Sequence, residues 1–339
     1  MSVEKIMKDW KNRSFKPVYW LEGEEEYFID KAVDYAEHHI IGESETAFNL
    51  TIFYGKDANW ADVVNACRRY PMFAERQVVI LKEAQQRRDA EKLETYIENP
   101  LSSTVFVVSY KDKKLDARKK FTKLIKEKGE LVTTRKLYES QLPEWTRALL
   151  QSKGLAISPK GVALLVDHIG NDLSRIENEI EKISVNLVRK DLPEGKPVVI
   201  SETDIEEYIG ISKDFNVFEL QAALAAKDLP GAIRIVQYFE ANPKAGPIQL
   251  ILPSLYSFFS KVFMVFGSRV QDEKGVAADI GVNPFFVKDY LQAARTYSFP
   301  EVEKVLLLLH HYNLRSVGVH DSGTGDASLL KEMLVKMMT

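Results

Sequence analysis

The sequence has little cysteine, no excess of one charge and no long apolar run. The single cysteine, Cys67, excludes an internal disulfide framework and any zinc site built from clustered cysteines. The 46 basic and 49 acidic residues give a formal charge of −3, so no large field of one sign drives the whole chain onto nucleic acid or an anionic membrane. The longest uncharged apolar stretch, residues 245–260, contains two prolines and is shorter than the roughly 20 residues of a membrane-spanning helix.

The N-terminus also lacks the continuous apolar segment of a secretory signal, because residues 1–16 mix charged and apolar side chains. These features predict a soluble cytoplasmic protein with no membrane partner. The length of 339 residues indicates two to three domains.

Residues 1–140 alternate between β-type and helix-type patterns. Short runs rich in β-branched and aromatic residues predict strands at 17–21, 48–54, 77–81, 104–110 and 130–134. Helical spacing of apolar residues separates most of them, and each crossover between parallel strands must pack a helix back onto the sheet. The pattern therefore predicts an α/β domain with a five-stranded, mainly parallel sheet and helices on both faces.

Beyond residue 140 the β pattern fades and helical spacing dominates. Residues 141–211 are expected to form a small helical domain, in which Leu173, Ile176, Ile180 and Ile183 make one apolar stripe. Residues 212–339 are expected to form a second, all-helical domain. Within it, Pro253 should kink or split a helix over residues 247–266.

The loop after the first predicted strand lacks the residues that bind a nucleotide. A phosphate-binding loop needs several glycines, a lysine and a serine or threonine, whereas this loop contains a single glycine among carboxylates: Glu22, Gly23, Glu24, Glu25 and Glu26. Carboxylates there repel an anionic ligand by roughly 1 to 4 kcal/mol per close pair. We therefore expect a degenerate nucleotide loop and no cofactor.

No other pattern indicates catalysis or metal binding. The histidines at 38–39 and 310–311 are adjacent pairs, which do not share a helix face, and neither stands in an HExxH motif. The expectation is no catalytic residue and no metal site.

Residues 111–136 concentrate basic side chains. The candidates for contact with DNA phosphates are Lys113, Lys114, Arg118, Lys119, Lys120 and Lys123. The same residues also fit a solvated helix face whose apolar side packs inward, and the sequence leaves both interpretations open.

A turn between a predicted helix and the third strand carries two large apolar residues. Pro71 ends the helix, so Met72 and Phe73, preceded by Tyr70, fall on the connection. Such side chains can tuck under the sheet or project as an anchor for a partner. The residues alone favour the tucked alternative.

Taken together, these segments resemble the delta subunit of the bacterial DNA polymerase III clamp loader over essentially the whole chain. The segments that carry the resemblance are 17–23 followed by acids, Trp60, 70–74, 76–81, 113–118, 171–182 and 214–220.

The resemblance implies an AAA+-like domain without a nucleotide site (residues 1–140), a helical lid (141–211) and a helical collar (212–339). It implies a non-catalytic subunit that binds and opens the sliding clamp for DNA replication, with Met72 and Phe73 as the wedge, flanked by Tyr70 and Pro71. The implied partners are the clamp, the clamp-loader ATPase and delta-prime subunits, and primer–template DNA through the assembled loader. On this basis the projecting alternative is preferred for the turn. A divergent AAA+ ATPase, or a collar scaffold that binds only sister subunits, remains the alternative.

Overall fold

The computed structural model describes residues 3–188, 198–210, 212, 214–243, 245–270, 272–321 and 323–339. It divides into two compact units, residues 1–137 and 138–339. The first ends three residues before the predicted boundary at residue 140. The second contains both segments predicted as lid and collar, and their boundary at 211–212 stays a prediction.

The first unit is built on one five-stranded sheet with the order β2-β3-β4-β1-β5. All four pairings are parallel. The strands are β1 (Val18–Gly23), β2 (Leu50–Tyr54), β3 (Gln77–Lys82), β4 (Thr104–Lys111) and β5 (Glu130–Thr134). All five predicted strands are therefore confirmed, with ends shifted by at most two residues.

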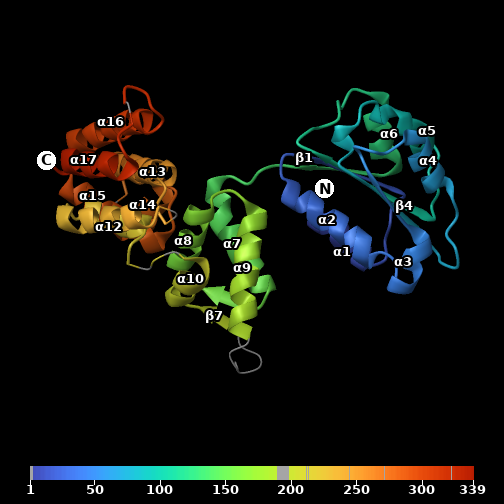
Figure 1. Ribbon diagram of the computed structural model, residues 1–339, viewed down its shortest axis with the longest axis horizontal. Helices are drawn as coiled ribbons and strands as arrows, with labels where there is room; N and C mark the ends of the chain where they lie inside the picture. The colour runs from blue at the N-terminus through green and yellow to red at the C-terminus, as the bar shows by residue number, and fades with distance from the viewer. Residues whose placement is uncertain are drawn as a thin grey trace. The chain divides into compact units, whose positions relative to one another are not determined.

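Helices cover both faces of this sheet (Figure 1). They are α1 (Val3–Lys11), α2 (Glu26–His39), α3 (Glu43–Asn49), α4 (Trp60–Arg68), α5 (Glu94–Ile97) and α6 (Lys120–Lys128), with the short 3-10 helices η1 (Ala84–Gln86) and η2 (Ala90–Leu93). Alternate β1 residues enter separate cores: Tyr19 and Leu21 pack with α1 and α2, whereas Trp20 packs with α4, α5 and α6. This alternation is the reason that the β1 segment reads as continuously apolar.

Helix α3 was not predicted, and it takes two residues from the expected second strand. Phe48 and Asn49 continue the alternating pattern of residues 50–54, but they belong to α3. Phe48 is exposed, and the buried Asn49 is held by polar contacts rather than by the sheet. A tertiary interaction therefore overrides the β pattern at this point.

The second unit is mainly helical. Its helices are α7 (Leu142–Ser152), α8 (Pro159–Ile169), α9 (Leu173–Val188), α10 (Glu202–Ile209), α11 (Val217–Ala225), α12 (Leu229–Ala241), α13 (Ile248–Gly267), α14 (Glu273–Asp279), α15 (Val287–Thr296), α16 (Phe299–Ser316) and α17 (Asp326–Met338), with 3-10 helices η3 (Glu139–Gln141) and η4 (Pro284–Phe286). The predicted stripe on α9 is buried. Helices α11–α13 and α15–α17 share one apolar core.

The segment predicted as a purely helical domain also contains a small parallel sheet. It is formed by β6 (Leu155–Ile157) and β7 (Val198–Ile200). Three residues are too few for a recognisable alternation, which is why the sequence pattern misses these strands.

Helix α13 has the predicted length, shifted by one residue, and is not split at Pro253. Leu252 and Leu255, on either side of this proline, are buried in the core, and this packing supports the turn that lacks one hydrogen bond. It has 20 residues and contains a window of 18 with a mean hydropathy of 1.5, which is enough by length and composition to cross a membrane. One such helix is weak evidence, because core helices of soluble proteins have the same composition, and one face of α13 belongs to the helical core.

Candidate functional site

The turn after α4 projects apolar side chains into solvent. Phe73 is 99% exposed, Tyr70 75% and Met72 53%, while Pro71 is half-buried. The tucked alternative favoured by the residues alone is therefore wrong. The sheet faces beside the turn are already filled by the apolar faces of the helices, so no space is left beneath them.

Asn49 fixes the turn from below through the backbone of Met72. Its Oδ1 accepts from the Met72 N–H at 2.7 Å and its Nδ2 donates to the Met72 carbonyl at 2.9 Å. Asn49 is only 2% exposed, so both bonds are shielded from water. This pair of bonds joins the end of α3 to the residue before Phe73 and limits the positions that the turn can adopt.

Gln77 and Thr104 hold the start of the turn. The Gln77 amide donates to the carbonyls of Ala66 and Arg69 and to Thr104 Oγ1, while Thr104 Oγ1 donates to the Cys67 carbonyl at 2.9 Å. These bonds, most of them buried, give the backbone carbonyls at the end of α4 side-chain partners. The turn thus begins from a fixed backbone.

Phe73 itself has a left-handed backbone, with φ +55°. This conformation is uncommon for a residue with a bulky side chain and costs of order 1 to 3 kcal/mol. A strained and fully exposed phenylalanine contributes nothing to the core. The combination is typical of a residue retained for contact with a partner.

The loop at residues 22–26 differs from the turn, because its carboxylates bind groups of the protein itself. Glu22 is 3% exposed, and its carboxylate accepts from the Leu115 N–H at 2.9 Å and from Thr133 Oγ1 at 3.1 Å. Burial raises the pKa of Glu22 above its ordinary value, although these two hydrogen bonds lower it in part. Gly23 has φ +125°, and a Cβ there would lie 2.1 Å from the Thr134 carbonyl oxygen.

The remaining carboxylates of this loop cap α2 or pair with lysines. Glu25 accepts from the Tyr27 N–H at 3.3 Å and caps α2. Glu24 lies 2.9 Å from Lys114 Nζ, which lowers the pKa of Glu24, and Glu26 lies 3.2 Å from Lys111. The N-terminus of α2, where phosphates bind in nucleotide-binding folds, is thus occupied by the protein's own side chains.

Most of the basic residues predicted as DNA contacts have partners within the chain. Lys114 pairs with Glu24, Arg118 with Asp116, Lys119 with Glu91, and Lys120 with both Glu94 and Glu98. Lys113 donates to the Gln85 carbonyl at 3.3 Å. Lys123 is exposed on α6, and Phe121 and Ile125 of this helix pack inward. The geometry therefore favours a charge-balanced helix face over a free cationic surface.

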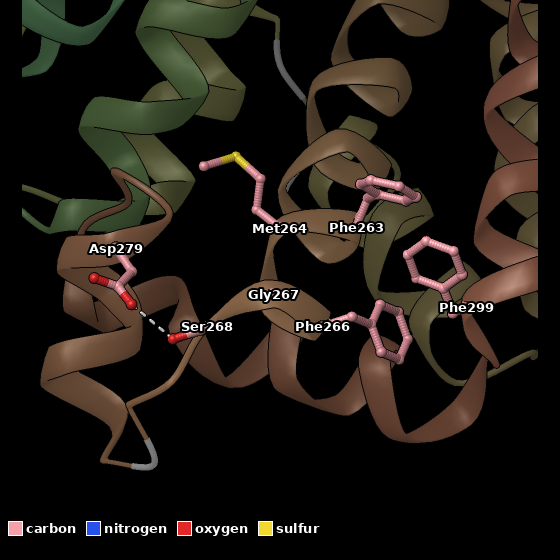
Figure 2. A pocket seen from close by; sticks show the side chains of 7 residues that line it. All are labelled: Phe263, Met264, Phe266, Gly267, Ser268, Asp279 and Phe299. Carbon is pink, nitrogen blue, oxygen red and sulfur yellow. Dashed lines mark hydrogen bonds between the residues drawn. The ribbon is translucent and has the colours of Figure 1, made fainter.

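The second unit has an apolar hollow of about 480 Å³ at the end of α13 (Figure 2). Phe263 and Phe266 of α13 flank Phe299, with ring centroids 4.7 and 5.8 Å from it. Ser268 donates to Asp279 at 2.7 Å on the other side. The hollow contains no arrangement of acids or bases suited to catalysis.

Groups that could hold a metal or act as a nucleophile are scarce. In the ranges that the structure describes, no cluster of three or more histidine, cysteine or acidic residues could hold a metal ion. Cys67 is buried on α4, and desolvation strongly raises the pKa of its thiol. A buried thiol of this kind is a packing residue rather than a reactive one.

Asn49 belongs to the site although no sequence motif indicates it. Its position in an alternating segment concealed it, and no sequence pattern links it to Met72, which lies 23 residues further along the chain. Only the hydrogen bonds between Asn49, at the end of α3, and the backbone of Met72 identify it.

Comparison with known proteins gives consistent matches. Residues 19–135 match the sequence model of a family described as DNA polymerase III, delta subunit. The chain is 23% identical to DNA polymerase III subunit delta of Bacillus subtilis (strain 168), over 97% of this chain and 95% of that protein. It is 22% identical to the probable DNA polymerase III subunit delta of Aquifex aeolicus (strain VF5), over 81% of this chain and 80% of that protein.

A solved structure shares the fold. The Bacillus subtilis DNA clamp loader delta protein superposes with a TM-score of 0.53 at 24% identity, and the match covers 99% of each chain. The resemblance drawn from the sequence is therefore confirmed: residues 19–135 match the DNA polymerase III delta-subunit family, and the two delta subunits are similar over most of the chain.

Proposed function

We propose that this chain is a non-catalytic clamp-loader subunit that binds a ring-shaped sliding clamp and opens it for loading onto primed DNA in the cytoplasm. It would act in a ring with the clamp-loader ATPase and delta-prime subunits, and meet primer–template DNA in that assembly. The observation that carries the proposal is the fully exposed, left-handed Phe73 beside the anchored Met72.

The turn offers enough binding energy for such a role. Burying two large apolar side chains contributes roughly 1.5 to 3 kcal/mol each. Moving a two-state equilibrium from 1:99 to 99:1 takes about 5.5 kcal/mol of differential affinity. The two side chains approach this differential affinity only if the clamp pocket that receives them is much better formed in the open clamp. The fixed backbone of Met72 also helps, because it reduces the entropy lost on binding.

The loop at residues 22–26 supports a role without nucleotide chemistry. The Glu22 carboxylate is already satisfied by Leu115 and Thr133, and Glu25 caps α2. Binding of a triphosphate there requires these contacts to break and brings the anion beside several carboxylates. ATP hydrolysis is therefore assigned to other subunits of the ring.

The test is binding of the purified sliding clamp of the same organism to the full chain, measured by surface plasmon resonance. The Met72→Ala, Phe73→Ala double variant should bind roughly 100-fold more weakly or worse, because each lost 1.4 kcal/mol is tenfold. A matched control is Leu307→Ala with Val317→Ala, since these residues are 69% and 67% exposed but lie in the second unit.

The control should bind as the unaltered chain does. Undiminished affinity of a folded Met72→Ala, Phe73→Ala variant would refute the wedge role. Calorimetric detection of Mg-ATP binding to the chain would instead favour the divergent ATPase.

A further inference from the structure

A second surface of the first unit has an excess of cations without partners. It is a hollow of about 270 Å³ between the β2–α4 connection and the segment from η1 to η2. Its lining residues are Lys56, Trp60, Gln86, Arg87, Arg88, Asp89 and Lys92. We refer to it as the basic hollow.

The charge of the basic hollow is not balanced locally. Of its four cations, Lys92 lies 3.4 Å from Asp89, the single carboxylate of the lining. Lys56, Arg87 and Arg88 form no ion pair within the part of the chain that the structure describes. Neighbouring like charges repel, so this arrangement is most stable with an anion present.

Two basic residues at the start of α6, unlike most of those in the basic hollow, are paired with carboxylates. Lys119 and Lys120 of the basic segment each lie within 2.7 Å of a carboxylate oxygen. An anion that binds α6 must first compete with these carboxylates, whereas an anion in the basic hollow displaces only water from three of its cations. The same unit thus contains one compensated and one uncompensated basic surface.

The backbone that carries the two arginines is held in place. Trp60 Nε1 donates to the Arg88 carbonyl at 3.1 Å, and Asp89 has a left-handed backbone with φ +62°. Gln85, two residues before Arg87, also binds the end of β4: its Oε1 accepts from the Lys111 N–H at 3.0 Å. The guanidinium groups therefore start from a fixed loop, which favours their use in directed contacts.

The location also fits a ligand site. Lys56 follows the end of β2 and Arg87 follows the end of β3, which are neighbouring parallel strands. In open parallel sheets, ligands bind outside the carboxyl ends of the strands.

We propose that the basic hollow binds the phosphodiester backbone of DNA through Lys56, Arg87 and Arg88. Arginine matches phosphate oxygens with a fork of donors, and lysine adds a point charge. The Trp60 ring is only 6% exposed and its N–H is occupied, so no base can stack on it and the contact is to phosphates. This proposal does not involve the turn at residues 70–73, and it replaces α6 as the main DNA-contacting surface of the first unit.

The experiment measures binding of a fluorescein-labelled DNA duplex to the full chain by fluorescence anisotropy at several salt concentrations. Each phosphate contact contributes about 0.9 to the slope of log affinity against log salt. The Lys56→Gln, Arg87→Gln, Arg88→Gln triple variant should therefore lose about 2 to 3 units of slope and bind at least about tenfold more weakly at low salt.

The matched control is Lys119→Gln, Lys120→Gln, Lys123→Gln, which removes the same charge from α6. It should keep its affinity within a small factor. Equal weakening by both triple variants, or none by the first, contradicts the proposal. Circular dichroism shows whether the first triple variant is folded. If it is not, the single variant Arg87→Gln should lower the slope of log affinity against log salt by about one. An unchanged slope in that variant would also contradict the proposal.

Two further measurements separate the alternatives. Inorganic pyrophosphate should not displace the duplex below millimolar concentration, and displacement at micromolar concentration would identify a small-anion site instead. The first triple variant should still bind the clamp. A chain that binds DNA through the basic hollow but does not bind the clamp would refute the proposed function while leaving this proposal intact.

Discussion

The loop at residues 22–26 and the turn at residues 70–73 are both connections of the first unit, but they differ in what their side chains contact. In the loop, Glu22 and Glu25 accept hydrogen bonds from the protein's own groups, and Glu24 pairs with Lys114. In the turn, Phe73 has its side chain in solvent while the backbone of Met72 is bound from below. A group that is satisfied internally has little to offer a ligand, whereas an exposed apolar side chain on a fixed backbone can bind a partner at small entropic cost.

The largest expected effect is a loss of stability when a side chain is added at Gly23, in the loop at residues 22–26. In Gly23→Ala, the added Cβ meets the Thr134 carbonyl oxygen at 2.1 Å in a backbone region with φ +125°. We expect the free energy of unfolding to fall by about 3 kcal/mol or more. Urea unfolding followed by tryptophan fluorescence measures this, because three of the four tryptophans, Trp10, Trp20 and Trp60, lie in the first unit.

Gly42→Ala is the control for the glycine substitution. The nearest atom to a Cβ at Gly42 is the Glu45 carboxylate, 3.9 Å away, and its φ is −71°. The expected loss is within about 1 kcal/mol. Similar losses for both variants would show that the close approach to Thr134 is unimportant.

Releasing the turn from Asn49 should produce the next largest effect. Asn49→Ala leaves the N–H and carbonyl of Met72 without their buried partner, which costs about 1 to 3 kcal/mol of stability. It should also weaken binding to the clamp, because the turn is no longer held in one position. Surface plasmon resonance on the same clamp surface checks the second effect.

Asn59→Ala separates positioning from stability. Asn59 caps α4 by accepting from the Ala61 N–H at 3.0 Å, and its loss costs about 1 kcal/mol. Clamp affinity should be unchanged in this variant. If both asparagine variants bind the clamp as the unaltered chain does, Asn49 has only a structural role.

A smaller effect is expected from the charge of Glu22. Because burial raises its pKa in the folded state, the folded protein takes up a proton here at a higher pH than the unfolded chain does. This contribution therefore makes the protein more stable as the pH falls from neutral through the raised pKa toward the ordinary value, and less stable as the pH rises.

The Glu22→Gln variant lacks this titration. In urea unfolding experiments, the free energy of unfolding of the unaltered chain relative to Glu22→Gln should increase as the pH is lowered from neutral toward the ordinary pKa of a glutamate. A difference that stays constant, or decreases, over this range would mean that the Glu22 carboxylate is not held at a raised pKa.

The smallest effect concerns the ion pair at the rim of the loop. Lys114→Gln removes the partner of Glu24, and both side chains are about half exposed. We expect a slightly lower melting temperature at low salt that disappears at high salt, because water and ions screen such pairs. A salt-independent loss in differential scanning fluorimetry would indicate a role for Lys114 beyond this pair.

Much of the first unit could be predicted from the sequence because its signals are local. The apolar runs that became β1, β3 and β4 are long enough to show burial on both faces, and the glycine-poor, acidic loop after β1 excludes a phosphate-binding loop by its residue types alone. The short strands β6 and β7 and the helix α3 escaped prediction because a few residues do not establish a period.

The site divides in the same way. Met72 and Phe73 were selected by their place after Pro71, and the resemblance to clamp-loader delta subunits favoured the projecting alternative over the tucked one. Asn49 could not have been found, because its partner lies far along the chain. The basic residues at 113–123 are predicted as DNA contacts because many basic residues lie close together in the sequence. That density does not show which of them already have a carboxylate nearby.

By itself, the sequence determined the order of strands and helices, the absence of a phosphate-binding loop and the position of the apolar turn, because each depends on neighbouring residues. Only the tertiary structure decided that Phe73 faces solvent, that Asn49 holds Met72, and that Lys119 and Lys120 are paired while Lys56, Arg87 and Arg88 are not. The reason is that exposure, buried hydrogen bonds and charge compensation are set by groups from distant segments, which meet only when the chain packs.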